Sequence, residues 1–476
     1  MPKASSEAPE HVKAPLGQSP ATLANREFVK PSHWCPKQDI EFDPWCDPDN
    51  PKTITYTEVI KASSVVRGVI PETNIVRSKW CKELKMELYH KNEICHRSGS
   101  FNERGALYCL LMLTPEQKQA GVVTASTGNW AMALAHQGQK LGVPVTVVIP
   151  ARTQPYTGER CAECGATVVR HGNDMAEAKR QAFVIAAEKD FSYLNGYDHP
   201  HAIAAAGAIG KEILDQLPET DVILVPVGGG GLLAGIAVAA KHIKPEVLIY
   251  GVESDKCCSF FKALENEQPY KTAVSRCLAE SLAVPTVGFN AFHTARSLID
   301  KMILVDDDWI ARAMLHLTEQ EKLVVEGAGA VGLAALLAVP QILPELRGKT
   351  VVSLLTGGNM DIVTLPHCLE RGKAIEGRII KVTVTLPADG TKEQLQVFSI
   401  ISNVGCNVLK CYSDRAWIVE NDLYTIHLSL IIETLNLEHA CRLKRVMERL
   451  FPGICDFLEE PFSPLPVCMC FPKKRP

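Results

Sequence analysis

The feature that most constrains this chain is a regular alternation of short apolar runs with helical segments between residues 51 and 375. The runs combine β-branched residues with a following glycine or polar break, and they are almost continuously apolar. Strands of this kind belong to parallel sheets that helices cover on both faces. The predicted strands are GVVTAS, VPVTVVIP, ATVVRH, DVILVPV, VLIYGVE and TVVSLLT. The sequence therefore predicts an α/β fold with a two-lobed parallel-sheet core over residues 51–375.

A different pattern begins near residue 376. RIIKVTVTLP and LYTIHLSLIIET alternate apolar and polar residues as half-exposed strands do, while TKEQLQVFSIISNVG and LEHACRLKRVMERLF have helical periodicity. The β-α-β-β-α order predicts a small ferredoxin-like domain over residues 376–465, followed by a tail over residues 466–476. Residues 1–50 are rich in proline, serine and charge, which predicts a disordered leader.

Composition and charge exclude several classes of protein. A net charge of −4 with both signs mixed argues against a nucleic-acid binder, and no run of eighteen apolar residues could span a membrane. The first residues have no apolar core like that of a signal peptide, so we expect a cytoplasmic protein with reduced cysteines. The one CxxC pair, Cys161 and Cys164, has no second pair to complete a metal site, so we predict no metal.

The strongest local signal is a run of four glycines, Gly228–Gly231, between a predicted strand and a predicted helix. Glycine lets the backbone approach an anion closely, and the first turn of a helix adds free N–H groups and the positive end of a dipole. This context favours a bound phosphate over a turn without a ligand. Gly229, Gly231 and Ala234 also fit a loose dinucleotide fingerprint, and Glu253 stands where a ribose-binding acid would, so a dinucleotide is an open alternative.

Two further predicted strands end in polar residues. Ser126, Thr127, Gly128 and Asn129 follow one strand and begin a helix, where hydroxyl, amide and N–H groups suit a small carboxylate, although N-capping alone would also explain the hydroxyls. Thr356 opens a similar Thr-Gly-Gly-Asn ending. Because the carboxyl ends of parallel strands meet at one edge of a sheet, we expect the three loops to face one ligand site.

The motifs SGSFNERGA, STGNWA, PVGGGGLLAG, EGAGAVGLAA and TGGN, in this order, resemble those of the fold-type II pyridoxal-phosphate enzymes. Within that class the chain is most similar to threonine and serine dehydratases, which are ammonia-lyases, with serine racemase as a close relative. The resemblance implies a tryptophan synthase β-like fold, the cofactor pyridoxal 5′-phosphate and an amino-acid substrate. LPADG and GCNVL resemble the ACT-like regulatory domain of threonine dehydratases, which implies a homo-oligomer.

The resemblance also assigns roles to residues. The implied cofactor-binding residues are Phe101, Asn129, Gly228, Gly229, Gly230, Gly231, Leu232 and Thr356. The implied substrate-binding residues are Ser126, Gly128 and Asn129, and Thr127 is a catalytic candidate. Glu253 matches one carboxylate of a racemase-type cation site, but Ser259 stands at a second position of that site, so we expect no cation there.

Two positions depart from the resemblance. Trp130 stands where the dehydratases usually have histidine, and Asn102 stands where the family motif S-F-K-x-R-G-A has its Schiff-base lysine. An amide nitrogen is essentially non-basic, so Asn102 can neither form the covalent link to the cofactor nor remove a substrate proton. We therefore expect pyridoxal phosphate, if bound, to bind non-covalently.

The surrounding residues bear on how the chain tolerates Asn102. Lys91, Lys82 and Lys85 lie upstream, and no motif places any of them in the site. Ser100 and Glu103 form an S-x-x-E pattern, which predicts a capping box and a normal start to the helix.

Three functions follow as hypotheses. The first is a catalytically impaired family member, a pseudoenzyme that retains cofactor or amino-acid binding. The second is an active ammonia-lyase that converts L-threonine to 2-oxobutanoate, or L-serine to pyruvate, with release of ammonia. The third is a dinucleotide-binding protein.

Overall fold

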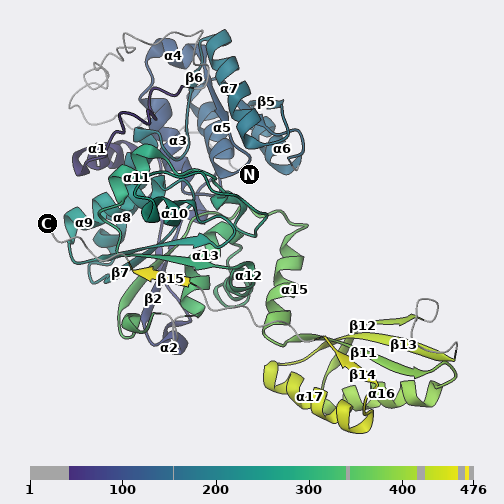
Figure 1. The fold of residues 1–476 in the computed structure, drawn as a ribbon. Coiled ribbons are helices and arrows are strands. Elements are labelled where there is room, and N and C mark those ends of the chain that lie inside the picture. Colours follow the sequence, from purple (N-terminus) through teal and green to yellow (C-terminus); the bar gives the residue numbers. More distant parts are fainter. Residues whose placement is uncertain (1–41, 154, 339–342, 415–423, 459–466, 471–476) are drawn as a thin grey trace, which may run out of the picture.

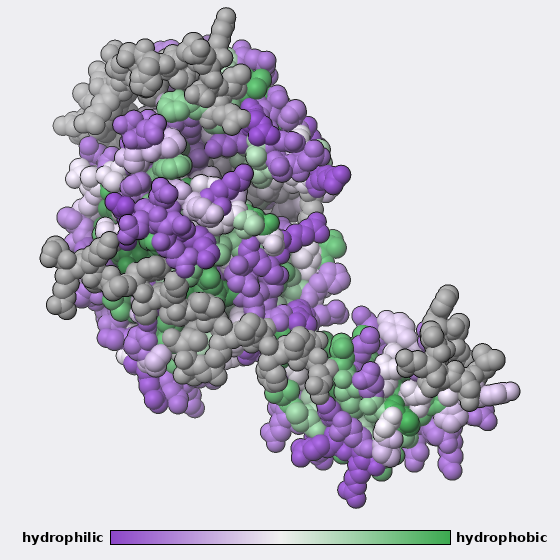
Figure 2. Space-filling model, viewed as in Figure 1, coloured by the Kyte–Doolittle hydropathy of each residue, from purple (hydrophilic) through white to green (hydrophobic). Residues whose placement is uncertain are grey.

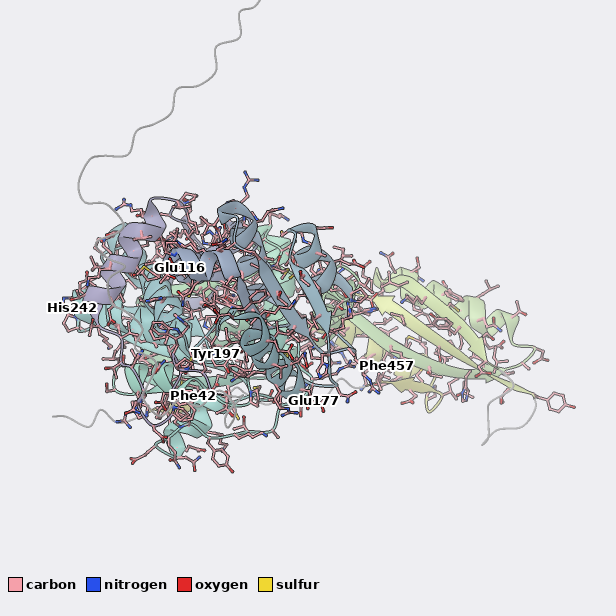
Figure 3. All side chains as sticks on the ribbon, turned by 90° about the horizontal axis from the view of Figure 1, so that it is seen from above. Phe42, Glu116, Glu177, Tyr197, His242 and Phe457 are labelled. Atoms are coloured by element: carbon pink, nitrogen blue, oxygen red, sulfur yellow. The ribbon has the colours of Figure 1, made fainter. Side chains whose placement is uncertain are left out.

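The structure consists of two α/β lobes and a smaller C-terminal domain that extends to one side of them (Figure 1). Seen from above, the C-terminal domain, in which Phe457 is labelled, lies beside the body that the two lobes form (Figure 3). This computed structural model describes residues 42–153, 155–338, 343–414, 424–458 and 467–470. Most of the predicted leader, residues 1–41, therefore lies outside the described residues.

The larger lobe is built on a sheet of seven strands in the order β1-β2-β10-β7-β8-β9-β15. Neighbours from β2 to β9 are parallel, whereas β1 and β15 pair antiparallel at the two edges. The strands are β1 (Ile75–Arg77), β2 (Glu87–Asn92), β7 (Val222–Pro226), β8 (Leu248–Ser254), β9 (Lys301–Val305), β10 (Thr350–Leu355) and β15 (Val467–Cys470). Every residue of β7 is buried, because helices cover both faces of the sheet.

The smaller lobe has four parallel strands in the order β5-β4-β3-β6. Its strands are β3 (Val122–Ala125), β4 (Val145–Ile149), β5 (Thr167–Arg170) and β6 (Ser192–Tyr193). All six strands predicted from the sequence are present, as β3, β4, β5, β7, β8 and β10. The predicted two-lobed parallel-sheet fold is confirmed.

Helices pack on both sides of each parallel sheet. On the larger sheet, α1, α8, α9 and α11 bury one face, while α12 and α13 bury the other. On the smaller sheet, α3, α5 and α6 lie on one side and α7 on the other. The helices are α1 (Tyr56–Arg67), α2 (Cys81–Leu84), α3 (Asn102–Leu111), α4 (Pro115–Ala120), α5 (Asn129–Leu141), α6 (Pro155–Glu163), α7 (Met175–Lys189), α8 (Pro200–Gln216), α9 (Gly231–Ile243), α10 (Ser259–Glu265), α11 (Phe289–Ala295), α12 (Asp307–His316) and α13 (Gly327–Leu337).

The C-terminal domain follows α15 (Leu365–Ile375) and has an antiparallel sheet in the order β12-β13-β11-β14. Its elements are β11 (Ile379–Pro387), α16 (Thr391–Val404), β12 (Asn407–Asp414), β13 (Thr425–Glu433), α17 (Leu437–Leu450) and β14 (Cys455–Phe457). Apolar residues alternate along β11 and β13 toward the two helices, so the predicted β-α-β-β-α order forms one small core. Arg378, just before β11, pairs with Glu319 of the larger lobe through two hydrogen bonds of 2.7 Å.

The chain returns to the larger lobe after the C-terminal domain. β15 pairs antiparallel with β9, with Cys468 opposite Ile303. These four residues belong to the tail that the sequence predicts, and the other residues of that tail lie outside the described residues. The edge of the larger sheet is therefore formed by the end of the chain.

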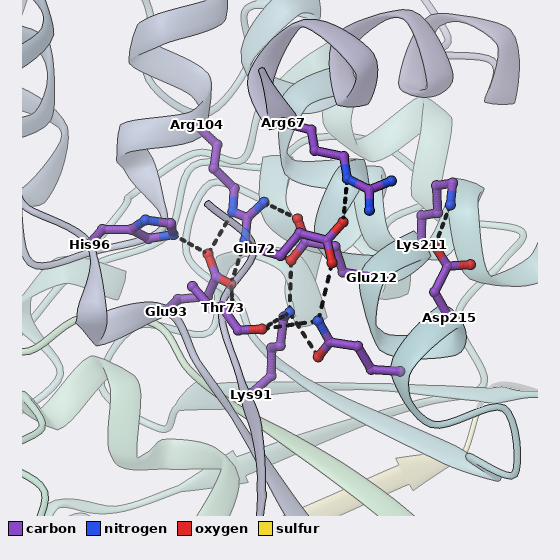
Figure 4. Close-up of polar contacts among 11 residues, drawn as sticks. Arg67, Glu72, Thr73, Lys91, Glu93, His96, Arg104, Lys211, Glu212 and Asp215 are labelled. Atoms are coloured by element: carbon purple, nitrogen blue, oxygen red, sulfur yellow. Dashed lines mark hydrogen bonds and ion pairs between the residues drawn. The ribbon is translucent and has the colours of Figure 1, made fainter. Parts of the chain in front are cut away.

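A buried cluster of ion pairs joins β2, α3 and α8 (Figure 4). Arg104 donates two hydrogen bonds to Glu93, of 2.8 and 3.0 Å, and its Nη2 donates to Glu212 at 2.9 Å. Lys91 Nζ donates to the same Glu212 at 2.7 Å. Burial opposes ionisation of Glu93, but Arg104 and His96 hold the pKa of Glu93 well below its ordinary value. Two cations and two carboxylates thus balance in the interior, which is the condition under which buried charges are tolerated.

We predict that Arg104→Met will lower the free energy of unfolding by about 3–5 kcal/mol, because it leaves buried carboxylates without their cation. Urea unfolding followed by tryptophan fluorescence would measure the change. Arg160→Met is the matched control, since Arg160 pairs with Glu163 at 3.4 Å on the surface and such pairs contribute about 1 kcal/mol or less. Equal losses in the two variants would contradict a structural role for the cluster.

Candidate active site

A cavity of about 730 Å³ lies between the two lobes. The carboxyl ends of β3, β7 and β10 open into it, which is the edge where parallel α/β sheets bind ligands. The residues singled out in the sequence that line it are Phe101, Asn102, Ser126, Thr127, Gly128, Asn129, Gly228, Gly229, Gly230, Gly231, Leu232 and Thr356. The fold therefore brings the three predicted loops to one space.

The glycine loop closes tightly at the start of α9. Gly230 precedes the helix with φ +93°, a left-handed conformation that favours glycine. A β-carbon on Gly231 would lie 2.2 Å from the backbone oxygen of Tyr197, so no side chain fits there. The first N–H groups of α9 have no carbonyl partner within the helix, and they offer donors to an anion at the cavity.

The loop after β3 presents its polar groups without using them as helix caps. α5 begins at Asn129 with Gly128 as its N-cap, and no side chain caps it. Simple N-capping by Ser126 or Thr127, the alternative explanation of these hydroxyls, is therefore wrong. The backbone oxygen of Thr127 instead accepts a hydrogen bond of 2.9 Å from the hydroxyl of Thr157.

Asn129 belongs to a chain of side-chain hydrogen bonds at the base of the cavity. Its Nδ2 donates to Glu326 Oε1 at 2.6 Å, and its Oδ1 accepts from Asn359 Nδ2 at 2.8 Å. Asn359 Nδ2 also donates to the backbone oxygen of Ser98 at 2.8 Å. These bonds fix the orientation of the Asn129 amide. Sequence analysis did not single out Glu326, because its partner is 197 positions away.

Asn102 is the first residue of α3 and lines the cavity. The preceding loop is held by β10, since Phe101 N donates to the backbone oxygen of Thr356 at 3.0 Å and Gly358 N donates to that of Gly99 at 2.9 Å. Among the described residues, none forms a hydrogen bond with the Asn102 side chain. The backbone fixes the position of residue 102, while no described hydrogen bond fixes the direction of its side-chain amide.

The capping box predicted from Ser100 and Glu103 is wrong. The N-cap of α3 is Phe101, and the hydroxyl of Ser100 is buried without a hydrogen-bond partner. The Glu103 carboxylate instead accepts from Ser98 N at 2.7 Å and from Gln137 Nε2 at 2.8 Å. The loop before α3 is held by backbone hydrogen bonds to Thr356 and Gly358, just after β10. In this position Ser98 N reaches the Glu103 carboxylate, which Ser100 does not.

Comparison with known proteins identifies the chain. The sequence profile of the pyridoxal-phosphate dependent enzymes matches residues 66–357. An L-threonine ammonia-lyase of Thermotoga maritima is 32% identical over 396 residues, covering 83% of this chain and 97% of that relative. The chain belongs to the pyridoxal-phosphate-dependent threonine ammonia-lyase family. A second L-threonine ammonia-lyase, from Geobacter sulfurreducens, is 38% identical over 334 residues, covering 70% of this chain and 82% of that relative.

Solved structures of related proteins have the same two-lobed core. The processed form of threonine deaminase isoform 2 from Solanum lycopersicum superposes with a TM-score of 0.63 at 29% identity, covering 68% of this chain and 90% of that one. Maize serine racemase gives a TM-score of 0.64 at 27% identity, covering 67% and 98%. The family fold confirms the fold-type II architecture predicted from the motifs.

The cavity fits the cofactor that defines this family. Its glycine loop leaves no room for side chains and offers backbone N–H groups, as a phosphate group requires. Thr356, which is 4% exposed, adds a buried hydroxyl at the end of β10. Both features line the same cavity as Asn129. In this threonine ammonia-lyase family member, the residues present therefore suit pyridoxal phosphate.

The five lysines considered for a role in the site of this family member lie in three different places. Lys91 is fully buried in the ion cluster, with its amine bonded to Glu212 and to the backbone oxygen of Thr73. Lys82 and Lys85 line a separate surface pocket near α2. Lys179 of α7 and Lys271, both missed by sequence analysis, line the cavity among the described residues. No motif marks these two lysines, so only the fold could have revealed them.

Trp130 forms part of one wall of the cavity. Its Nε1 donates to Thr124 Oγ1 at 3.1 Å, and its ring occupies the space next to Gly196. A β-carbon on Gly196 would lie 2.4 Å from the indole, so Gly196 makes room for the larger side chain.

Glu253, the candidate ribose-binding acid, is bonded to the backbone of the chain itself. Its two carboxylate oxygens accept hydrogen bonds from Phe260 N at 2.8 Å and Phe261 N at 2.9 Å, at the start of α10. Burial raises the pKa of Glu253 to about 8, although these hydrogen bonds lower it. These hydrogen bonds give Glu253 a structural role, so of the observations that motivated dinucleotide binding only the pattern of Gly229, Gly231 and Ala234 remains. Among the described residues, Cys161 and Cys164 belong to no cluster of three or more potential metal ligands.

We predict that Gly231→Ala will lower the free energy of unfolding by about 1–3 kcal/mol, because the added methyl group meets the backbone of Tyr197 and forces it to shift. The matched control is Gly68→Ala, where φ is −68° and the nearest atom would lie 3.5 Å away. Thermal unfolding of both variants would measure the difference. A Gly231→Ala protein as stable as the Gly68→Ala control would contradict the prediction, because the loop would then accommodate a methyl group at residue 231.

Proposed function

We propose that this chain binds pyridoxal 5′-phosphate and a hydroxy amino acid, L-threonine or L-serine, in the cavity between its lobes. The observation that carries the proposal is the convergence of the glycine loop, the Ser126–Asn129 loop and Thr356 on one cavity. Membership of the threonine ammonia-lyase family supports the same ligands. When bound, pyridoxal phosphate would supply an electron sink next to the substrate α-carbon.

Each loop has a proposed task. Gly228–Gly231 and Leu232 hold the cofactor phosphate through backbone N–H groups at the start of α9. Thr356 faces the pyridine nitrogen with a neutral hydroxyl, and Phe101 lines the ring. The residues proposed to bind the substrate carboxylate are Ser126, Gly128 and Asn129, of which Asn129 also contacts the cofactor. Thr127 is the proposed polar group next to the reacting atoms.

Asn102 is proposed to make the ammonia-lyase reaction slow. Its amide cannot accept a proton, and loss of a general base lowers rates by roughly 10²- to 10⁴-fold. The cofactor would then be held by its phosphate and ring contacts without a covalent link. This first candidate function is binding of the cofactor and an amino acid with little turnover.

The second candidate is an active L-threonine or L-serine ammonia-lyase. The curated relatives favour it over the first, because both are L-threonine ammonia-lyases and one of them aligns over 83% of this chain. Lys179 and Lys271 line the cavity and provide amines whose participation can be tested. The two candidates differ only in the rate of turnover and in whether an amine of the chain attaches to the cofactor.

We predict that Asn102→Lys will create or strongly increase ammonia-lyase activity and covalent cofactor attachment. Purified protein would be incubated with pyridoxal phosphate, treated with borohydride and analysed by mass spectrometry, while oxo-acid production from L-threonine and L-serine is followed in a coupled assay. Asn102→Gln is the matched control, since it lengthens the side chain without adding an amine.

The outcomes separate the candidates. An active enzyme is supported if wild-type protein forms more oxo acid than a cofactor-only blank and borohydride fixes the cofactor to Lys179 or Lys271. Wild-type protein without product, together with an active Asn102→Lys variant, supports the impaired family member. Failure of both proteins to bind pyridoxal phosphate would overturn the proposed function.

The C-terminal domain is proposed to act as an ACT-like pairing unit in a homo-oligomer. It exposes large apolar side chains, which are typical of surfaces that another protein covers, and hydrophobic residues are visible on its face in Figure 2. The most exposed are Leu395, Tyr412, Tyr424, Leu435 and Leu458. No described helix is both long enough and apolar enough to cross a membrane. A cytoplasmic location stays a prediction from the sequence.

A further inference from the structure

The carboxyl group of Glu326 is a buried feature of the cavity that the proposed function leaves unused. Glu326 precedes α13 as its N-cap, yet its side chain does not cap that helix. The residue is 7% exposed and lines the cavity, and its carboxylate lies against the backbone of Gly357, directly after Thr356. A helix-capping role is therefore excluded as the reason for this carboxyl group.

The hydrogen bonds of Glu326 determine what Asn129 can offer to a ligand. The Asn129 oxygen is occupied by Asn359, and one of the two hydrogens on its nitrogen is donated to Glu326 at 2.6 Å. An amide nitrogen carries two hydrogens, so the second remains for a group in the cavity. Asn129 is thus oriented as a donor, which suits an anionic oxygen.

The charge environment of Glu326 is unusual for a carboxylate. Among the described residues, no cation forms an ion pair with it, and Glu280 is the charged group that acts on it. The pKa of Glu326 is raised to about 7, chiefly by burial and also by Glu280, against the lowering effect of hydrogen bonds from Asn129 and Ser281. Glu326 is therefore a carboxyl group that lines the cavity and has a pKa near neutral pH.

We propose that Glu326 is a positioning residue that orients Asn129 and takes up a proton when an anionic ligand binds at that amide. The inference rests on the proposed function, because the ligand is the phenolic oxygen of a pyridoxal-phosphate-type molecule. A negative charge behind Asn129 repels such an oxygen across a medium of low dielectric constant, whereas a neutral carboxyl does not. Ligand binding and proton binding at Glu326 therefore favour each other.

The sign of the effect follows from this coupling. Below pH 7 the carboxyl is neutral and binding is strongest, and as pH rises through 7 the carboxylate forms and binding weakens. Coupling free energies between sites change affinity by roughly 5- to 150-fold, so we expect a loss of about 10-fold between pH 6 and pH 8. Glu326→Gln keeps an acceptor for Asn129 without a titrating group, and its affinity should lack this loss.

The experiment measures binding of deoxypyridoxine phosphate, the aldehyde-free analogue of the cofactor, which cannot attach to lysines. Full-length wild-type protein and Glu326→Gln are titrated between pH 5.5 and 8.5, and binding is followed by tryptophan fluorescence. Titration of the ligand itself affects both proteins equally, so it cancels in the ratio of their dissociation constants. We expect that ratio to change about 10-fold across neutral pH.

Two further variants make the test specific. Glu280→Gln removes the other carboxylate that acts on Glu326 and should shift the midpoint downward without removing the pH dependence. Glu326→Asp keeps a titrating carboxyl group, so its affinity for the analogue should still depend on pH. This variant also tests the proposal if Glu326→Gln proves unstable. Loss of pH dependence in Glu280→Gln, or its persistence in Glu326→Gln, would overturn the proposal.

The failure of this inference is distinguishable from failure of the proposed function. Analogue binding that has the same pH dependence in wild-type protein and Glu326→Gln overturns the role of Glu326 alone. Absence of binding to either protein at every pH overturns both.

Discussion

The rest of the structure depends on the buried pairing of Arg104 with Glu93 and Glu212. It joins the turn that follows β2, the first helix after the candidate catalytic loop and the long helix α8, and it does so with hydrogen bonds of 2.8 to 3.0 Å. Arg104 lies two residues after Asn102, so the same contacts that hold the lobes together also fix where residue 102 stands. The position is set by the scaffold, whichever side chain occupies it.

Because the scaffold fixes this position, the side chain at residue 102 can vary without disturbing the fold. The Asn102 side chain takes part in none of the described hydrogen bonds, whereas its neighbours are held by β10 and by Glu103. A substitution at such a position alters reactivity at small cost in stability.

Much of the fold could be predicted from the sequence, because the signals are local. The residues of β7 are apolar on both faces, and the glycine loop lies between a strand and a helix, so a short window is sufficient to recognise both. The capping box failed for the opposite reason, since the loop before α3 is set by Thr356, far along the chain. Lys179 and Lys271 reach the cavity through tertiary packing, and no spacing within the sequence encodes that. Glu326 opens the motif EGAGAVGLAA, but its bond to Asn129 spans 197 positions and could not be read from the motif.

The return of the chain as β15 has a consequence for the C-terminal domain. That domain is joined to the larger lobe at both ends, through α15 before it and β15 after it, so it is an insertion between two parts of one unit. A chain shortened after α15 would leave the N–H and C=O groups of β9 open at the sheet edge. Open edges invite pairing with other chains, so β15, which follows this domain, also protects the larger lobe from aggregation.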